Sequence, residues 1–320
     1  MSKIALEKKL EALRGLGQSG DARAGVTKAL GDSSNYVVSK GAELCAELGL
    51  RELAPELVAA FERLRQGGAK SDPQCWGKTA IAKALSEMAW RGPGLFVSGL
   101  RHRQLEPVWG GETDTAMGLR AVCAEALVST ELDGEAILRL LVWALGDESK
   151  LVRVAAVGAV AQLSRWEGEL LLRQKVIGGD NEPEVMGACM AGILELGERG
   201  AMDFVASFIG EEEVRGLEAI AAMAQSRHAE AVRLVMAQWR RGLGVEAQKT
   251  IAISLGASPL EEARDALLEL LQEARGAVAV CAVAGLGSSR YRDEVRERVL
   301  AIVSEKGERN VTEAFREEFG

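Results

Sequence analysis

Histidine and proline are scarce in this sequence of 320 residues, and aromatic residues make up only 4% of it. The two histidines, His102 and His228, stand far apart in the sequence and belong to no HExxH motif, and the cysteines form no CxxC pair. Because metal sites need clustered ligands of these types, we expect no metal site. The sequence also contains no G-x-S-x-G motif around a nucleophilic serine. We therefore assign no catalytic residue and no cofactor, although a Ser-His-Asp or Cys-His site assembled from distant residues is compatible with the sequence.

Long apolar runs are missing too. The richest one, residues 277–287, is shorter than the roughly 18 residues that a membrane-spanning helix needs. Residues 1–10 mix charges into a helical spacing, unlike a signal peptide. The cysteines are odd in number and widely spaced among apolar residues, which is typical of buried free thiols; they are Cys45, Cys75, Cys123, Cys189 and Cys281. We expect a cytoplasmic monomer with no membrane partner.

An excess of positive charge is absent as well. The chain has 39 Lys and Arg against 47 Asp and Glu, which gives a net charge of -8. Because nucleic-acid binding relies on clustered Lys and Arg, a nucleic-acid partner is disfavoured, although a local basic patch is compatible with this charge. With 48% hydrophobic residues the chain can bury a core. Its abundance of Ala, Leu, Val and Glu, with few prolines, predicts an all-α protein.

A repeated pattern runs along most of the sequence. Residues 147–156 follow the order Asp-x4-Val-Arg-x-Ala-Ala, and residues 114–123 and 180–189 keep this frame at spacings of 33 residues. The position of Val152 serves as the anchor of the repeat. Other anchors are Val37, Gly77, Val214, Val245 and Val278, and successive anchors are separated by 40, 42, 33, 33, 29, 31 and 33 residues. Such a period predicts an array of similar supersecondary units.

One unit can be derived from residues 135–163. A first helix over 135–145 ends in a short turn, where the Asp147 carboxylate can accept the free N–H groups of the next helix. The second helix, about 150–163, is apolar on most sides and needs neighbours on several faces. Its Ala and Gly residues allow close helix packing. Several copies end with Leu-Gly. Glycine readily adopts the left-handed backbone conformation that ends a helix, and the glycines in question are Gly49, Gly197, Gly256 and Gly287.

This pattern resembles HEAT repeats, and particularly the short HEAT-like units also found in phycobilisome lyases. The resemblance covers nearly the whole chain and implies an α-solenoid with an armadillo-like helical fold. In that family, the Asp of the turn and the Arg after the Val stack from unit to unit as a polar ladder. The resemblance therefore implies structural roles for Asp32, Asp72, Asp114, Arg120, Asp147, Arg153, Asp180 and Arg215.

The ladder is incomplete in this sequence. Lys78 takes the place of the Arg in the copy that begins at Asp72. Asp32 and Asp180 keep the acid, but Val38 and Met186 stand where the Arg would be. From residue 214 onward the Asp is missing, so the ladder is expected to fade in the C-terminal third.

We expect a single array over residues 1–320, with about nine helix pairs and no linker rich in Pro or Ser. A helix within residues 1–20 is predicted to cap the N-terminal end, and a short charged helix within 305–320 to cap the other end. Two copies exceed 33 residues, and insertions in solenoids map to loops, often on a binding side. The first, residues 65–72, is polar and glycine-rich and predicts a flexible loop.

The second insertion, residues 101–114, predicts a longer inter-helix loop with a composition suited to recognition. It combines Arg101, His102 and Arg103 with Glu106 and with Trp109 beside two glycines. Arg and rigid aromatic side chains dominate interface hot spots, so these five residues are candidate partner-binding residues. In the alternative interpretation, the tryptophan packs back over the gap that the loop leaves, and the glutamate only pairs with Arg103.

The tryptophans outside the 101–114 insertion are expected to have structural roles in helices. Trp76, Trp90 and Trp143 lie in predicted repeat helices and are expected in the core or in a groove wall. Trp239 is followed by Arg240 and Arg241 at the end of a predicted helix, where cations suit the helix dipole.

Three functions are compatible with the sequence. The one we favour is a non-catalytic scaffold or adaptor that holds a protein or peptide on the concave face and the 101–114 loop. The second is an enzyme on the same fold, since HEAT-like lyases attach bilins and another HEAT-like group excises alkylated bases from DNA. The glycosylases need a basic concave track, which the net charge of -8 disfavours. The third is a binder of nucleic acid or a small ligand without catalysis.

Overall fold

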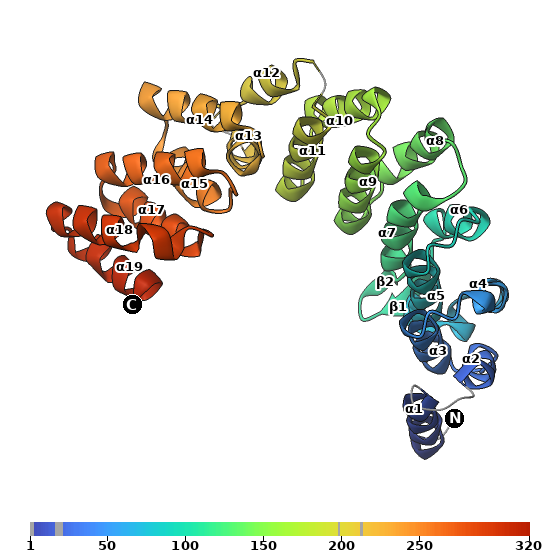
Figure 1. The fold of residues 1–320 in the computed structure, drawn as a ribbon. Helices are drawn as coiled ribbons and strands as arrows, with labels where there is room; N and C mark the ends of the chain where they lie inside the picture. Colours follow the sequence, from blue (N-terminus) through green and yellow to red (C-terminus); the bar gives the residue numbers. More distant parts are fainter. Residues whose placement is uncertain (1–2, 17–21, 198, 212–213) are drawn as a thin grey trace. The chain divides into compact units, whose positions relative to one another are not determined.

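The computed structural model describes residues 3–16, 22–197, 199–211 and 214–320. These residues form nineteen α-helices and one two-stranded β-sheet, so the predicted all-α class is confirmed (Figure 1). The small sheet was not predicted. Among the described residues, no helix combines the length and the apolar character that crossing a bilayer requires. The contacts divide the chain into two compact units, Met1–Leu163 and Ser164–Gly320, which are described separately.

In unit 1 (Met1–Leu163), helix α1 is followed by four helix pairs. The members of each pair contact each other, as α2 and α3 do, and so do α4 and α5, α6 and α7, and α8 and α9. The second helices also pack in chain order, α3 on α5, α5 on α7 and α7 on α9 (Figure 1). The helices are α1 (Lys3–Leu16), α2 (Ala22–Leu30), α3 (Asn35–Glu47), α4 (Ala54–Ser71), α5 (Trp76–Glu87), α6 (Gly94–Leu100), α7 (Met117–Ala126), α8 (Gly134–Leu145) and α9 (Lys150–Gln162), with the short 3₁₀ helices η1 (Arg51–Leu53), η2 (Pro73–Cys75) and η3 (Leu127–Ser129).

Unit 2 (Ser164–Gly320) continues the alternation with five pairs among its described residues. The second helices again pack in chain order, from α11 through α13, α15 and α17 to α19, and the first helices α12, α14, α16 and α18 form a parallel series of contacts. The helix expected near the C-terminus is α19, which packs on α17 and α18. The elements are α10 (Trp166–Gly178), α11 (Pro183–Leu196), α12 (Ala201–Ala206), α13 (Val214–Gln225), α14 (Ala229–Arg241), α15 (Val245–Gly256), α16 (Glu261–Glu273), α17 (Gly276–Ser288), α18 (Arg292–Lys306) and α19 (Arg309–Phe319).

Most anchor residues of the sequence repeat are buried within the first three residues of a second helix. These anchors are Val37, Gly77, Leu119, Val152, Val185 and Val278. The assignment of Val214 and Val245 as anchors was wrong, because they are the first residues of α13 and α15 and are about half exposed. The buried face of these two helices begins later, at Gly216 and Ile251.

The glycines that close the repeats have two different roles. Gly49 and Gly197 adopt the predicted left-handed conformation, with φ near +65°. The prediction of a left-handed conformation was wrong for Gly256, which is the last residue of α15, and for Gly287, which lies inside α17. There the missing side chain matters for packing, because a Cβ on Gly256 would lie 2.4 Å from the carbonyl oxygen of Gly285. Close backbone contact between α15 and α17 therefore depends on glycine, as the small residues of the repeat indicate.

Both insertions differ from the predicted loops. Residues 65–72 are mostly helical, since α4 continues to Ser71 through a break at Gly68, where φ is 59°. The Ser71 hydroxyl donates hydrogen bonds to the carbonyl oxygens of Leu64 and Gly68 and closes this last turn. Within 101–114, strands β1 (Leu105–Val108) and β2 (Gly111–Asp114) form an antiparallel hairpin instead of an irregular loop.

The thiols give a first testable prediction. Burial raises the pKa of the Cys45 thiol to about 11 and those of Cys75 and Cys189 to about 12, and it also raises the pKa of Cys123. Because the thiolate is the reactive form, we expect these four thiols to react slowly with a disulfide reagent at about pH 8 in the native protein. The partly exposed Cys281 should react first.

The measurement is the time course of thionitrobenzoate release, with labelled sites identified by mass spectrometry. The control is the chain unfolded in guanidinium, in which all five thiols should react rapidly. Fast labelling of Cys123 in the folded chain would contradict the burial of this thiol in unit 1.

Candidate functional site

A cluster of charged side chains joins the turns that precede α7 and α9 in unit 1. The guanidinium of Arg120, only 1% exposed, donates to both carboxylate oxygens of Asp147 at 2.9 and 3.0 Å and to Asp114 at 2.6 Å. Arg103 lies 3.1 Å from each of the same two carboxylates. Two residues of the predicted ladder, Asp114 and Asp147, are thus brought together through Arg120. Arg103, a candidate partner-binding residue, belongs to this cluster as well.

The cluster affects the proton affinity of Asp114. Burial raises the pKa of this carboxyl, but the N–H groups of Ala116 and Gln104 and the guanidinium groups of Arg120 and Arg103 outweigh it, so the pKa lies below its usual value. The carboxylate therefore stays ionised and holds the end of β2 against the start of α7.

A second polar cluster ties the hairpin to the pair formed by α4 and α5. Asp72 and Lys78 form a fully buried ion pair at 3.0 Å, and Asp72 also accepts the N–H groups of Gly77 and Lys78. The Lys78 ammonium donates to Gln104 at 2.8 Å, and the Gln104 amide donates to the backbone oxygen of Asp72 and to Glu106. Each buried polar group thereby finds a partner, as burial requires.

Glu106 holds the base of the hairpin and does not pair with Arg103, so the predicted pairing was wrong. Its carboxylate is nearly buried and accepts hydrogen bonds from the Thr115 hydroxyl at 2.6 Å and the Gln74 N–H at 2.7 Å. Gln74 and Cys75 have left-handed φ angles of 61° and 56°, which cost energy in residues other than glycine. The contact with Glu106 stabilises this strained segment, while Arg103 pairs with the cluster around Arg120.

The other residues of the predicted ladder contact partners of several kinds. Asp32 pairs with Lys9 of α1 at 2.6 Å, and Asp180 pairs with Lys175 at 2.8 Å, so in both copies the cation comes from an earlier helix. Arg153 donates to the backbone oxygens of Asp147 and Glu148. Arg215 pairs with Glu211 four residues earlier and stacks on Phe208.

Trp109, at the tip of the hairpin, is the most exposed large apolar side chain among the described residues. Trp109 has a relative exposure of 103%, so the alternative in which it packs over a gap was wrong. Gly110 follows it with φ of 92°, the left-handed value that a tight turn needs at this position. Arg101 is exposed at the end of α6, whereas His102 is only partly exposed. Of the five candidates, Arg101, Arg103 and Trp109 are exposed, and Arg103 is held in the charged cluster around Arg120.

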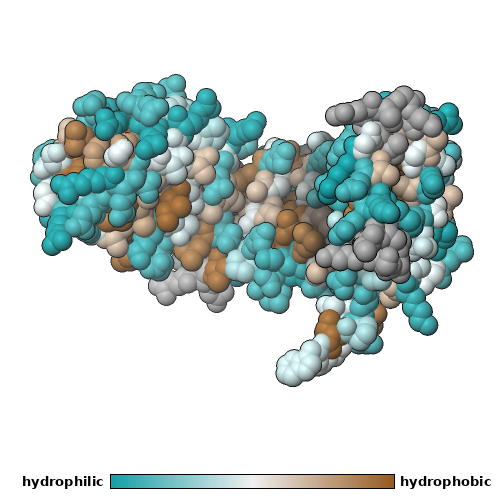
Figure 2. All heavy atoms as spheres, turned by 90° about the horizontal axis from the view of Figure 1, so that it is seen from below, coloured by the Kyte–Doolittle hydropathy of each residue, from teal (hydrophilic) through white to brown (hydrophobic). Residues whose placement is uncertain are grey.

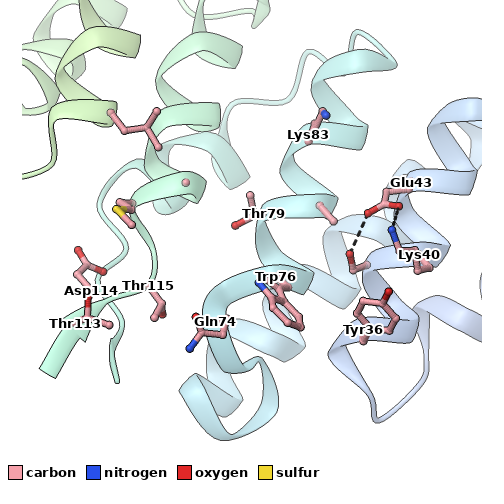
Figure 3. Close-up of a pocket in the computed structure, with 15 residues that line it drawn as sticks. Tyr36, Lys40, Glu43, Gln74, Trp76, Thr79, Lys83, Thr113, Asp114 and Thr115 are labelled. Atoms are coloured by element: carbon pink, nitrogen blue, oxygen red, sulfur yellow. Dashed lines mark hydrogen bonds and ion pairs between the residues drawn. The ribbon is translucent and has the colours of Figure 1, made fainter. Parts of the chain in front are cut away.

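A groove of about 700 Å³ opens on the second-helix face of unit 1 beside the hairpin (Figure 3). In this view Trp76 lies between Tyr36 on one side and the hairpin residues on the other. The groove is open rather than enclosed and combines aromatic, aliphatic, hydroxyl and charged groups. Its lining residues are Tyr36, Ser39, Lys40, Glu43, Gln74, Trp76, Thr79, Ala80, Lys83, Thr113, Asp114, Thr115, Met117, Gly118 and Leu151.

The aromatic part of the groove is built by two neighbouring second helices. The rings of Tyr36 and Trp76 meet edge to face with centroids 6.0 Å apart, and the Lys40 ammonium lies 5.8 Å from the Tyr36 ring. Lys40 also pairs with Glu43 one turn further along α3. Trp76 remains 53% exposed, so it forms a groove wall and not core. Trp143 of α8 is likewise exposed, and Trp239 of α14 is buried.

The sequence repeat contains a signal for this groove that the motif analysis missed. The residue immediately before the anchor is Tyr36, Trp76, Gly118 or Leu151 in the four successive copies of unit 1, and all four line the groove. Six positions after the anchor, Glu43 and Lys83 line it as well. Because the anchor faces the core, its neighbour in the helix turns toward the open face. Aligning the copies by their anchors would have identified these positions.

Among the described residues, no group of three or more His, Cys, Asp or Glu side chains is placed so that it could hold a metal ion. The groove instead presents hydroxyl and amide groups for hydrogen bonding next to exposed aromatic surface.

A scan of the sequence against protein-family models gives no match, and a search of curated proteins gives none either. The function is therefore inferred from the fold and from the groove.

Proposed function

We propose that the chain is a HEAT-like α-solenoid and acts as a non-catalytic scaffold that holds a partner protein or peptide. The partner would lie on the face formed by the second helices, at the groove of unit 1 and the adjoining 101–114 hairpin. The fold proposal is supported by the succession of helix pairs and by second helices that pack in chain order within each unit. Such stacking buries surface that one pair alone leaves open.

The observation that carries the binding proposal is the row of side chains before the anchors. Trp76 and Leu151 keep about half of their surface exposed although they are large and apolar. Seen from the side shown in Figure 2, apolar residues form small patches separated by hydrophilic ones. A local concentration of aromatic surface in a groove, bordered by a hairpin with an exposed Trp109 at its tip, is the composition of an interaction site.

Replacing Trp109 with alanine tests this function. The side chain makes no buried contact, so we expect the melting temperature to stay within about 2 °C of the wild type. Capture of the partner should fall about tenfold or more, because a tryptophan at an interface often contributes at least about 1.4 kcal/mol to binding. Arg101→Ala should act in the same direction with a smaller effect.

The measurement is affinity capture from a native lysate, quantified by mass spectrometry for the wild type and each variant. Trp166→Ala is the matched control, since it removes another exposed tryptophan, which belongs to α10 of unit 2 and does not line the groove. A protein lost with Trp109→Ala and retained with Trp166→Ala would support the scaffold. Equal capture by all variants, or a large drop in melting temperature for Trp109→Ala, would contradict it.

A further inference from the structure

The hydrogen bonds of the hairpin determine which backbone groups of β2 remain unpaired. The N–H of Thr115 donates to the carbonyl oxygen of Gln104 at 2.9 Å, just beyond the paired strands. In an antiparallel pair, hydrogen-bonded and non-hydrogen-bonded positions alternate, so Thr113 and Glu106 form the next bonded pair. The N–H and C=O groups of Glu112 and Asp114 therefore point away from β1. None of the described residues bonds these groups.

The two edges of the hairpin differ in what they offer. The outward positions of β1 are Leu105 and Pro107, which lie opposite Asp114 and Glu112. Proline has no N–H, so the β1 edge lacks a donor that an added strand would need. The β2 edge keeps both of its outward donors and both acceptors, and such an edge is a template for another extended segment.

The open edge borders the groove. Thr113, Asp114 and Thr115 line the same groove as Trp76 and Met117, and Figure 3 shows the three hairpin residues along the side of the groove that faces Trp76. A strand added to β2 would pair with it at about 4.8 Å and place every second side chain toward the groove. The residue opposite Thr113 would point into the groove.

The hairpin is also held in place before any partner arrives. Glu106 and Gln104 fix its base to η2 and to the buried pair of Asp72 and Lys78, and Asp114 fixes the end of β2 to Arg120. A rigid edge loses little conformational entropy when a partner binds, which favours affinity.

We propose that β2 binds an extended peptide segment of a partner protein as a third strand, with an apolar side chain of that segment in the groove against Trp76. An extended segment is the occupant because only a strand presents free N–H and C=O groups in the alternation that Glu112 and Asp114 offer. A helix has already used its own backbone groups. The proposal rests on the proposed scaffold function and specifies its mode of binding.

The experiment compares the full chain with two proline variants. Glu112→Pro removes an outward N–H from β2 without removing a bond of the β1–β2 ladder, and Leu105→Pro does the same on the β1 edge. A random decapeptide library displayed on phage is selected on the wild-type chain. The affinity of the enriched peptides is then measured for all three proteins, and amide exchange is followed by NMR.

Strand addition predicts at least about a tenfold loss of affinity for Glu112→Pro and unchanged affinity for Leu105→Pro. It also predicts that bound peptide slows the exchange of the Glu112 and Asp114 amides in the wild type. The amides of Thr113 and Thr115 are protected by β1, and their slow exchange in both variants would show that the hairpin is intact.

Two results would overturn the proposal. If peptides are enriched but bind Glu112→Pro as well as wild type, with unchanged exchange at Glu112 and Asp114, strand addition fails while a peptide-binding scaffold stands. If the wild type enriches no peptide, both the binding mode and the proposed function fail for peptide partners.

Discussion

Replacing Arg120 with alanine is expected to lower the free energy of unfolding of unit 1 by about 3–5 kcal/mol. The guanidinium is 1% exposed and holds the carboxylates of Asp114 and Asp147. Without it, the nearly buried Asp147 loses two hydrogen bonds from a buried cation and keeps the half-exposed Arg103 at 3.1 Å, and an undercompensated buried charge is costly. For a unit of this size the melting temperature should fall by about 6–20 °C, measured by differential scanning calorimetry.

The effect should depend on pH. The pKa of Asp114 is lowered in the folded chain, so its contribution to stability is present above about pH 4 and is lost as the pH falls through the folded pKa. The difference in stability between wild type and Arg120→Ala should therefore shrink in acid.

Arg139→Ala is the control, because Arg139 pairs with Glu135 on an exposed helix face. Its removal should change stability by less than about 0.5 kcal/mol. If Arg120→Ala were as mild as this control, the charged cluster would have no structural role in joining the turns.

Replacing Val152 with aspartate should unfold the part of unit 1 around α9. The valine is completely buried, so an aspartate at its position would place a carboxylate in the interior of the unit. A charge buried without a partner costs several kcal/mol, which is comparable to the whole stability of an ordinary domain. Circular dichroism should show a loss of helix, and calorimetry should show the loss or a strong downward shift of the transition of unit 1.

The adjacent residue provides the matched control. Leu151 is 51% exposed toward the groove, so Leu151→Asp introduces the same charge one position away and should leave the helix content nearly unchanged. Similar losses of helix in both variants would mean that the anchor does not separate the core from the open face.

The helices could be predicted because the apolar periodicity and the turn residues give the same answer. The first helix expected over 135–145 is α8, and the anchor positions locate the starts of most second helices. Where the prediction failed, a tertiary contact outweighs the local preference. Gly287 stays inside α17, although glycine after leucine favours a stop, and its position packs so closely on α19 that a Cβ there would lie 2.6 Å from the Cβ of Glu318.

The candidate site was predictable only in part. Arg and Trp in the 101–114 insertion indicated an exposed feature, and Trp109 is indeed at its tip. The hairpin was not evident, because its strands are only four residues long and one contains a proline. The burial of Glu106 depends on Gln74, 32 residues earlier, and on Thr115, which the unpredicted hairpin brings back to it, and no local pattern records those contacts.

For the proposed binding function, the position before each anchor determines how the specificity of the groove can change. Tyr36, Trp76, Gly118 and Leu151 are each next to a residue that faces the core, yet they contribute to the outer lining instead. Exchanging one of them alters the chemistry of a single stretch of the groove and leaves the interior untouched. In the proposed scaffold, affinity for new partner sequences would therefore change one copy at a time, by substitutions that the fold tolerates.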